Sequence, residues 1–168
     1  MNKLLVSSML AIGLSMTTAA FAEKYAVVDM QKAATDTNYM KAQKASLDAA
    51  LKPQQQTHER LTKEITSLQN KAQAEGKNMK EADLRKLEQD YAAKMNAYNE
   101  NAANMQKRVQ TSLETINQTL GPKIEQVVEN LRKQGGYSMV IDRKAVVSYD
   151  PSIDLTMQVT QQVNTVLK

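Results

Sequence analysis

Apolar residues in the middle of the chain recur at helical spacing and form two long runs. In the first, steps of four and three residues alternate, which is a heptad pattern with two polar positions. Its members are Leu47, Leu51, Gln54, His58, Leu61, Ile65, Leu68 and Ala72. The second run has about 3.6 residues per step, the period of a nearly straight helix. Its members are Leu84, Leu87, Tyr91, Met95, Tyr98, Ala102, Met105, Val109, Leu113, Ile116, Leu120, Ile124, Val127 and Leu131.

The polar segment 74–80 separates the two runs and predicts that the chain reverses there. Gly76 suits the left-handed conformation that ends many helices, and Asn78 with Glu81 resembles a capping box. We therefore predict an antiparallel helical hairpin over residues 40–121 with its tip near 74–80. Two helices of about forty residues would form an arm that projects roughly 60 Å.

Prolines interrupt the pattern at Pro53 and at Gly121-Pro122. Because proline lacks the backbone donor and clashes with the preceding turn, we expect a kink at each place. Gly121 and Pro122 lie where the arm should return to the rest of the protein. They are the predicted hinge.

Short apolar segments at both ends of the chain predict β-structure. The first is 24–29, and the segments 137–142 and 145–149 flank Arg143-Lys144 in the manner of a β-hairpin. Asp154 is expected to cap a last helix. A single strand is not stable alone, and an isolated two-stranded hairpin is only marginally stable in water. The first strand should therefore pair with the later ones.

These ends predict a β-rich body over residues 23–39 and 122–168 that also serves oligomerisation, because its strands leave apolar edges undercovered. The predicted contact residues are Val27, Val28, Val140, Ile141, Val146 and Val147. The fold class is α+β and mostly helical. It is a long antiparallel helical hairpin on a small β-rich base that both chain ends form.

The first 22 residues have the features of a cleaved secretory signal peptide. Lys3 supplies the positive start, a short apolar run follows, and small residues precede the expected cleavage between Ala22 and Glu23. The alternative is a retained membrane anchor, for which the apolar run is short. We expect export and a mature chain that starts at Glu23.

Composition narrows the function classes. Without Lys3 the chain has 21 basic and 18 acidic residues, a mild excess that could attract acidic partners and predicts at most a weak membrane-surface contact. It lacks the dense basic stripe of nucleic-acid binders, so no nucleic-acid partner is expected. Cysteine is absent and only 4% of residues are aromatic, so stability must come from helix pairing or oligomerisation.

No catalytic or cofactor motif is present. His58 is the only histidine, and it lies on the helical seam without the neighbours of a catalytic triad. The chain has no P-loop, glycine-rich nucleotide turn or HExxH motif. The alternative in the base is a carboxylate cluster that binds a metal, but capping and strand-end roles explain each acid singly. We expect no enzyme activity, no cofactor and no metal.

Soft apolar side chains along the arm are the candidate binding residues. A polarizable face would suit varied polypeptide clients, and the candidates are Met79, Tyr91, Met95, Tyr98 and Met105. The alternative, which we favour for the members on the seam, is ordinary packing between the helices. The candidate electrostatic tip comprises Lys71, Lys77, Lys80, Arg85 and Lys86, although five acids in residues 71–90 balance it and make a solvated tip the simpler interpretation.

The two ends of the mature chain resemble the Skp/OmpH family of periplasmic chaperones. The segments that carry this resemblance are 24–30 (KYAVVDM), 136–142 (GYSMVID), 145–149 (AVVSY) and 151–156 (PSIDLT). The resemblance implies a homotrimer with three helical arms around a cavity. It also implies that unfolded outer-membrane β-barrel proteins are the partners, carried across the periplasm without ATP.

Two hypotheses of function follow. The first is an ATP-independent periplasmic holdase that binds unfolded outer-membrane proteins between its arms. The second is a structural coiled-coil spacer or adaptor of the cell envelope. A spacer would usually show longer uninterrupted heptads and no elaborate β-base, so the sequence favours the holdase.

Overall fold

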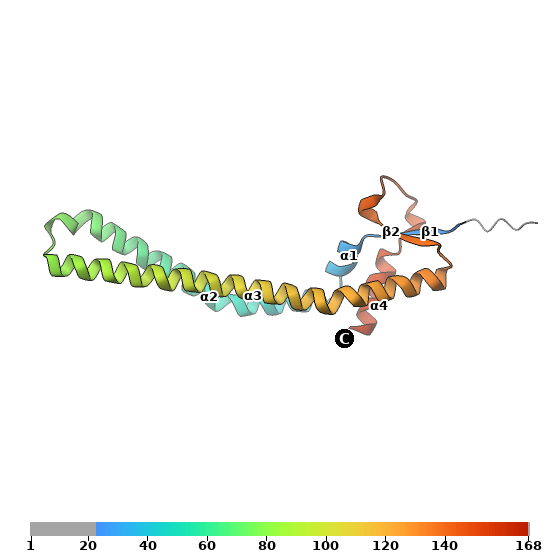
Figure 1. The fold of residues 1–168 in the computed structure, drawn as a ribbon, viewed down its shortest axis with the longest axis horizontal. Helices are drawn as coiled ribbons and strands as arrows, with labels where there is room; N and C mark the ends of the chain where they lie inside the picture. The colour runs from blue at the N-terminus through green and yellow to red at the C-terminus, as the bar shows by residue number, and fades with distance from the viewer. Residues whose placement is uncertain (1–22, 168) are drawn as a thin grey trace, which may run out of the picture.

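Two helices, α2 (Asn38–Glu75) and α3 (Glu81–Gly135), form most of the protein and run antiparallel as an arm that projects from a small body (Figure 1). The computed structural model describes residues 23–167. The predicted helical hairpin is confirmed, and at 1.5 Å per residue α2 alone is roughly 57 Å long. The predicted signal peptide and its cleavage site at Ala22 lie outside the described residues.

The tip forms where predicted but by a different local structure. Gly76–Asn78 make a short 3₁₀ helix, η1, and Gly76 has φ −54° and ψ −39°, so the predicted left-handed glycine is wrong. The capping box is also wrong, because Lys80 precedes α3 and no side chain caps it. A 3₁₀ turn reverses the chain without a left-handed residue, since Met79 N donates to the Gly76 carbonyl.

Both helices continue through their prolines. Pro53 lies inside α2, and Pro122 lies inside α3, which is unbroken from Glu81 to Gly135. Gly121 and Pro122 therefore do not interrupt α3, and the kinks expected at the two prolines stay predictions. The buried neighbours Leu120 and Ile124 hold this segment against the body, so packing outweighs the one lost donor. Whether the arm pivots there stays a prediction.

The body is built from both ends of the chain, as predicted. It contains strand β1 (Tyr25–Val28), helix α1 (Met30–Thr35), strand β2 (Met139–Asp142), two 3₁₀ helices, η2 (Arg143–Ala145) and η3 (Pro151–Ile153), and helix α4 (Thr156–Val166). The strands pair in parallel, with Tyr25 opposite Met139 and Val28 opposite Asp142. Val27 also bridges to Asp154 on the other edge of β1.

The predicted strand 145–149 and its β-hairpin are wrong in this chain. After β2 the Asp142 carboxylate accepts a hydrogen bond of 2.8 Å from Lys144 N, which bends the chain into η2. Residues 146–150 then form a loop, and Val147 is fully exposed. The sheet has two strands, so β2 has one neighbour and one free edge.

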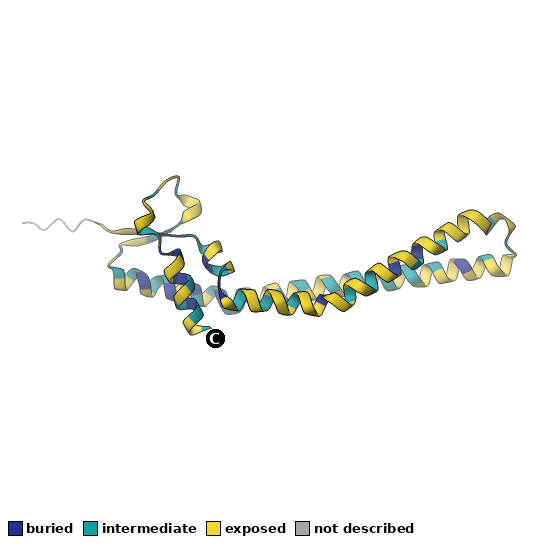
Figure 2. Cartoon of the chain, turned by 180° about the vertical axis from the view of Figure 1, so that it is seen from behind, coloured by how far each residue is buried: buried dark blue, intermediate teal, exposed yellow. Residues whose placement is uncertain are grey.

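The connected hydrophobic core lies in the body, and the arm has only a few buried residues of its own. This core joins the strand β1, the body half of α3 and one face of α4, and dark patches in Figure 2 mark these segments. Val28, Val159 and Val163 have no exposed surface. Burial stabilises each such side chain by about 1.5 to 3 kcal/mol. The body thus anchors an arm that has little core of its own.

The end of α3 is shaped by two glycines. Gly136 caps the helix with φ 65°, the only positive φ among the described residues, and its N–H donates to the Arg132 and Lys133 carbonyls. At Gly135 an added Cβ would overlap the Tyr137 ring. This close turn aims the chain into β2, directly beside β1.

Candidate functional site

The seam between α2 and α3 has two apolar parts separated by a polar one. Leu61 and Ile65 of α2 with Leu87 of α3 are buried toward the tip. Between Leu87 and Ile116, no residue of α3 is buried. Figure 2 accordingly shows the arm as mostly exposed or half-buried surface.

Polar and aromatic contacts fill the middle of the seam. The rings of His58 and Tyr98 stack with centroids 4.2 Å apart, and Asn101 Nδ2 donates to the main-chain carbonyl of Gln54 at 3.0 Å. Two buried atoms here, Gln54 Oε1 and His58 Nδ1, have no hydrogen-bond partner. His58 thus has a packing role in the seam, as its position in the sequence suggested.

An ion pair links the helices nearer the tip. Lys94 Nζ lies 2.7 Å from Glu64 Oε2, and Arg60 holds the other carboxylate oxygen at 2.8 Å. The close contact with the Lys94 ammonium and then the hydrogen bond from Arg60 lower the pKa of Glu64. Because a third or more of both the Lys94 and the Glu64 side chain is exposed, solvent screens this ion pair and it contributes little to stability. It fixes the register of the helices more than it stabilises them.

The five candidate client-binding residues are all half-buried. Four of them lie on α3 along the seam, and Met79 lies at the tip between η1 and α3. Tyr98 stacks on His58, and the Tyr91 hydroxyl accepts a 3.2 Å hydrogen bond from Gln69. Asn101 Nδ2 approaches Met105 Sδ at 3.7 Å. These side chains therefore contribute to helix packing and keep part of their surface in solvent.

Toward the tip the two helices separate (Figure 1), and two hollows lie there that residues of both helices line. One, of about 650 Å³, is lined by Met79 together with a mixture of lysines and acids. The other, of about 530 Å³, is more apolar and includes Leu68, Leu84 and Tyr91. Two of the candidate residues, Met79 and Tyr91, thus line open spaces at the tip.

The candidate electrostatic tip is an exposed, charge-balanced surface. Lys71, Lys77, Lys80, Arg85 and Lys86 are all exposed. Arg85 pairs with Glu81 one turn away on the same helix. Lys71, Lys80 and Lys86 share the larger tip hollow with Glu75, Asp83 and Asp90. This surface offers no net charge with which to select a partner.

A third groove lies along the half of the arm nearer the body, and the sequence did not suggest it. Its volume is about 650 Å³, and it runs between residues 43–54 of α2 and 104–115 of α3. Its lining is rich in hydroxyl and amide side chains, with Lys107 and Arg108 as its charged members. No motif marks it, because it depends on how the two helices are rotated against each other.

The candidate oligomerisation residues divide by burial. Val27 and Val28 are buried within the chain, and Val140, Ile141 and Val146 are half-buried. Val147 is fully exposed, with Met139 and Tyr25 also among the exposed apolar residues of the body. Val147 and the free edge of β2 are the parts of this set that remain available to another chain.

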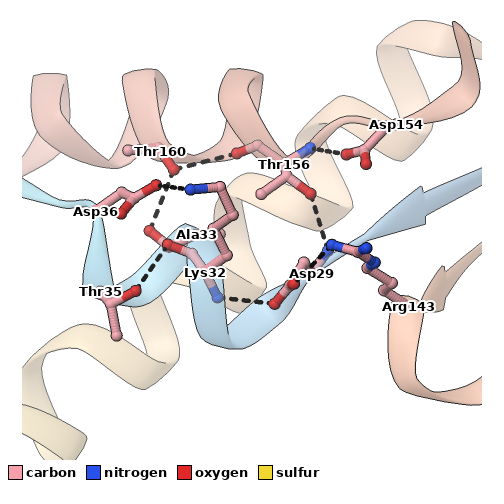
Figure 3. Close-up of polar contacts among 9 residues, drawn as sticks. All are labelled: Asp29, Lys32, Ala33, Thr35, Asp36, Arg143, Asp154, Thr156 and Thr160. Atoms are coloured by element: carbon pink, nitrogen blue, oxygen red, sulfur yellow. Dashed lines mark hydrogen bonds and ion pairs between the residues drawn. The ribbon is translucent and has the colours of Figure 1, made fainter. Parts of the chain in front are cut away.

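A hydrogen-bond network holds the body loop in place (Figure 3). Asp29 N donates to Thr156 Oγ1 at 2.9 Å, and the Asp29 carboxylate lies 3.4 Å from Arg143. Asp154 accepts from Thr156 N and, at 2.7 Å, from the Tyr149 hydroxyl. Burial alone would raise the pKa of Asp154, but these bonds outweigh it and lower the pKa.

The prediction that Asp154 is the N-cap of α4 is wrong, because Leu155 holds that position and no side chain caps the helix; the Asp154 carboxylate instead accepts a hydrogen bond from Thr156 N, two residues further on. Within residues 23–167, no cluster of three or more potential metal ligands occurs. No helix in that range is long and apolar enough to cross a bilayer.

Comparison with known proteins identifies the family. The model of the family described as outer membrane protein (OmpH-like) matches residues 24–163, which is most of the chain. The chain belongs to the Skp/OmpH family. The resemblance carried by the two chain ends is thereby confirmed.

Relatives in this Skp/OmpH family agree with that assignment. The chain is 31% identical over 147 residues to a Skp-like protein of Pseudomonas aeruginosa, covering 87% of this chain and 88% of the relative. It is 27% identical over 164 residues to the chaperone protein Skp of Yersinia enterocolitica, covering 97% and 99%. The family is one of chaperones and not of enzymes.

The fold has a counterpart among solved structures. A putative OmpH-like outer membrane chaperone from Caulobacter crescentus superposes with a TM-score of 0.65 at 22% identity, over 88% of this chain and 87% of that one. At this identity the likeness concerns the fold alone. It supports the same architecture, a helical arm on a small α+β body.

Proposed function

We propose that this protein is an ATP-independent holdase of the periplasm that binds unfolded outer-membrane β-barrel proteins and prevents their aggregation before membrane insertion. The observation that carries the proposal is the arm. Two long helices stand away from the body that holds the core, and their seam leaves methionine and tyrosine side chains half in solvent. The names of the relatives, a chaperone and an outer membrane chaperone, support the same role.

Holding in this proposal comes from many shallow contacts. Each half-buried apolar side chain offers little contact area, so a client can leave without nucleotide hydrolysis. Several arms around one client raise the effective concentration of such contacts and sum them to tight retention. The mild positive charge speeds capture of acidic clients at low salt.

The arms meet, in this proposal, in a homotrimer assembled through the body. The free edge of β2 and the exposed Val147 are the features that support assembly there. A free strand edge readily pairs with another chain. Three copies joined at their bodies would place three arms around one cavity.

Delivery to the periplasm rests on residues 1–22 acting as a signal peptide that is cleaved between Ala22 and Glu23. Purifying the exported protein and sequencing its N-terminus tests this. A protein that retains residues 1–22 would contradict it.

The decisive experiment measures assembly and holding together. Native mass spectrometry of the mature protein should give three times the chain mass. An unfolded β-barrel protein diluted from urea should then stay soluble with the chaperone and without ATP. A variant whose hairpin is shortened between Ile65 and Met95 should assemble normally and hold nothing.

Two outcomes would contradict the proposal. A monodisperse monomer at micromolar concentration would exclude the trimer. Holding that survives loss of the arm would exclude the arm mechanism, whereas an intact protein that holds no client would favour the structural spacer.

A further inference from the structure

The groove on the body half of the arm has the dimensions of a short extended peptide. It spans residues 43–54 on α2 and 104–115 on α3, and its volume is about 650 Å³. Eleven helical steps of 1.5 Å make it about 16 Å long. An extended polypeptide advances about 3.3 Å per residue, so about five residues fit along it.

Small side chains keep this groove open. Ser46 and Ala50 line it from α2, one turn apart, and Thr111 and Ser112 line it from α3. Hydroxyl groups both donate and accept hydrogen bonds. The walls therefore match the alternating N–H and C=O groups of an extended backbone, which have no partners in an unfolded chain.

The charge of the groove is of one sign. Lys107 and Arg108 are its only charged lining residues, and both are exposed. Among the described residues, neither has a carboxylate within 4 Å. The tip hollow differs, because acids there accompany the lysines. The groove thus favours a segment that carries carboxylates.

Gln54 is a further polar residue of the groove lining. Its Oε1 is buried without a hydrogen-bond partner. A buried acceptor left unpaired is unfavourable. Rotation of the amide toward the groove would let a backbone N–H of a bound peptide satisfy it.

We propose that this groove binds acidic segments of an unfolded polypeptide in extended conformation, with Lys107 and Arg108 contacting the carboxylates. The inference rests on the proposed holdase function. It adds a defined binding place on the arm and a preference for client segments that carry negative charge.

The test uses labelled peptides of about seven residues, long enough to span the groove. One peptide alternates Ser and Glu, and two matched peptides carry Gln or Lys in place of Glu. Fluorescence anisotropy with the full mature protein should show the Glu peptide binding about fivefold more tightly than the Gln peptide at low salt, a ratio that exposed charge pairs can supply. The preference should shrink as salt rises.

Two pairs of variants assign the binding to the groove. The double variant Lys107→Gln/Arg108→Gln should remove the preference for Glu. Lys52→Gln/Lys63→Gln makes the same change of charge at exposed positions of α2 outside the groove and should keep it. Ala50→Leu should block the groove, and Ala49→Leu, at the neighbouring exposed position, should not. Circular dichroism checks that all four retain their helices.

Equal binding of the Glu and Gln peptides would overturn the inference, and so would equal losses in the two charge variants. Binding of phosphatidylglycerol vesicles without binding of the Glu peptide would also overturn it, because the groove would then serve a lipid surface. The proposed function fails by a different result, namely that the unmodified protein does not keep an unfolded β-barrel protein soluble. A protein that holds clients but shows no peptide preference refutes the groove alone.

Discussion

Truncating Leu61 should weaken the arm far more than truncating Leu113, although both leucines lie on its long apolar runs. Leu61 is 3% exposed, whereas Leu113 is 52% exposed. Replacing a buried leucine by alanine costs about 2 to 5 kcal/mol. The arm is narrow and can partly collapse around the change, so we expect the low end, about 2 to 3 kcal/mol, for Leu61→Ala.

Hydrogen exchange of the native protein measures this difference locally. Since 1.4 kcal/mol is a factor of ten, Leu61→Ala should raise the opening of amides around residues 55–100 by about thirty- to a hundredfold. Amides of α4 in the body should keep their protection, because the core there has no contact with Leu61. Leu113→Ala, the matched control, should change exchange by less than about threefold.

Two results would refute this reasoning. Equal effects of the two variants would mean that burial in the seam does not set arm stability. Loss of protection in α4 as large as in the arm would mean that arm and body unfold together, so the arm would have no independent flexibility for clients.

Three further predictions concern the end of α3, the Glu129 carboxylate and the place where the arm joins the body. Gly136→Ala should lower the melting temperature because φ 65° costs a non-glycine residue roughly 1 to 2 kcal/mol, whereas Gly76→Ala, at negative φ with open space around it, should be neutral or stabilising. The Arg132 hydrogen bond lowers the pKa of Glu129 from 4.5 to about 2. The ionised Glu129 therefore stabilises the folded protein fully above pH 4.5, and this stabilisation is lost as the pH falls toward 2. In Glu129→Gln the free energy of unfolding, measured in urea, should depend less on pH between 4.5 and 2. Replacing Gly121 and Pro122 with alanine should stabilise α3 and narrow the range of client sizes that the protein holds. If hydrogen exchange shows that this segment of the unmodified protein is as protected as its neighbours, there is no hinge.

The arm could be predicted because its signal is local. A helical period needs only the chain itself, and Leu51, Leu61 and Ile65 of the first run are indeed buried. The pattern failed at Leu113, where the half-buried Ser112 is the more enclosed residue. The rotation of the partner helix decides which of two adjacent residues faces the seam. The apolar character of a residue therefore does not tell which of the two is buried.

The body was predicted in outline and missed in detail. Pairing between the two chain ends followed from the need of each short strand for a neighbour. The segment 145–149 has strand-like composition, yet it forms a loop because the Asp142 carboxylate stabilises a 3₁₀ turn and no neighbouring strand of this chain adjoins it. Strand formation depends on a partner, which composition does not reveal.

The candidate site was the least predictable part. Met95 and Tyr98 were recognisable as seam residues, but the groove beside Lys107 and Arg108 was not. Ser46 and Ala50 are ordinary helix-surface residues in the sequence. They become the wall of a groove only when the opposite helix supplies a second wall.

The parallel pairing of β1 with β2 has a consequence for how the protein is made. Tyr25 is among the first residues of the body to leave the ribosome, and its partner Met139 is synthesised 114 residues later. The hairpin of α2 and α3 lies entirely between them, and its formation brings the two ends of the long loop together. If α2 and α3 pair first, the entropy cost of bringing β1 and β2 together is therefore smaller. Until that happens the strand Tyr25–Val28 is an unpaired apolar segment, so during its own synthesis this chain carries the same kind of exposed surface that a chaperone protects.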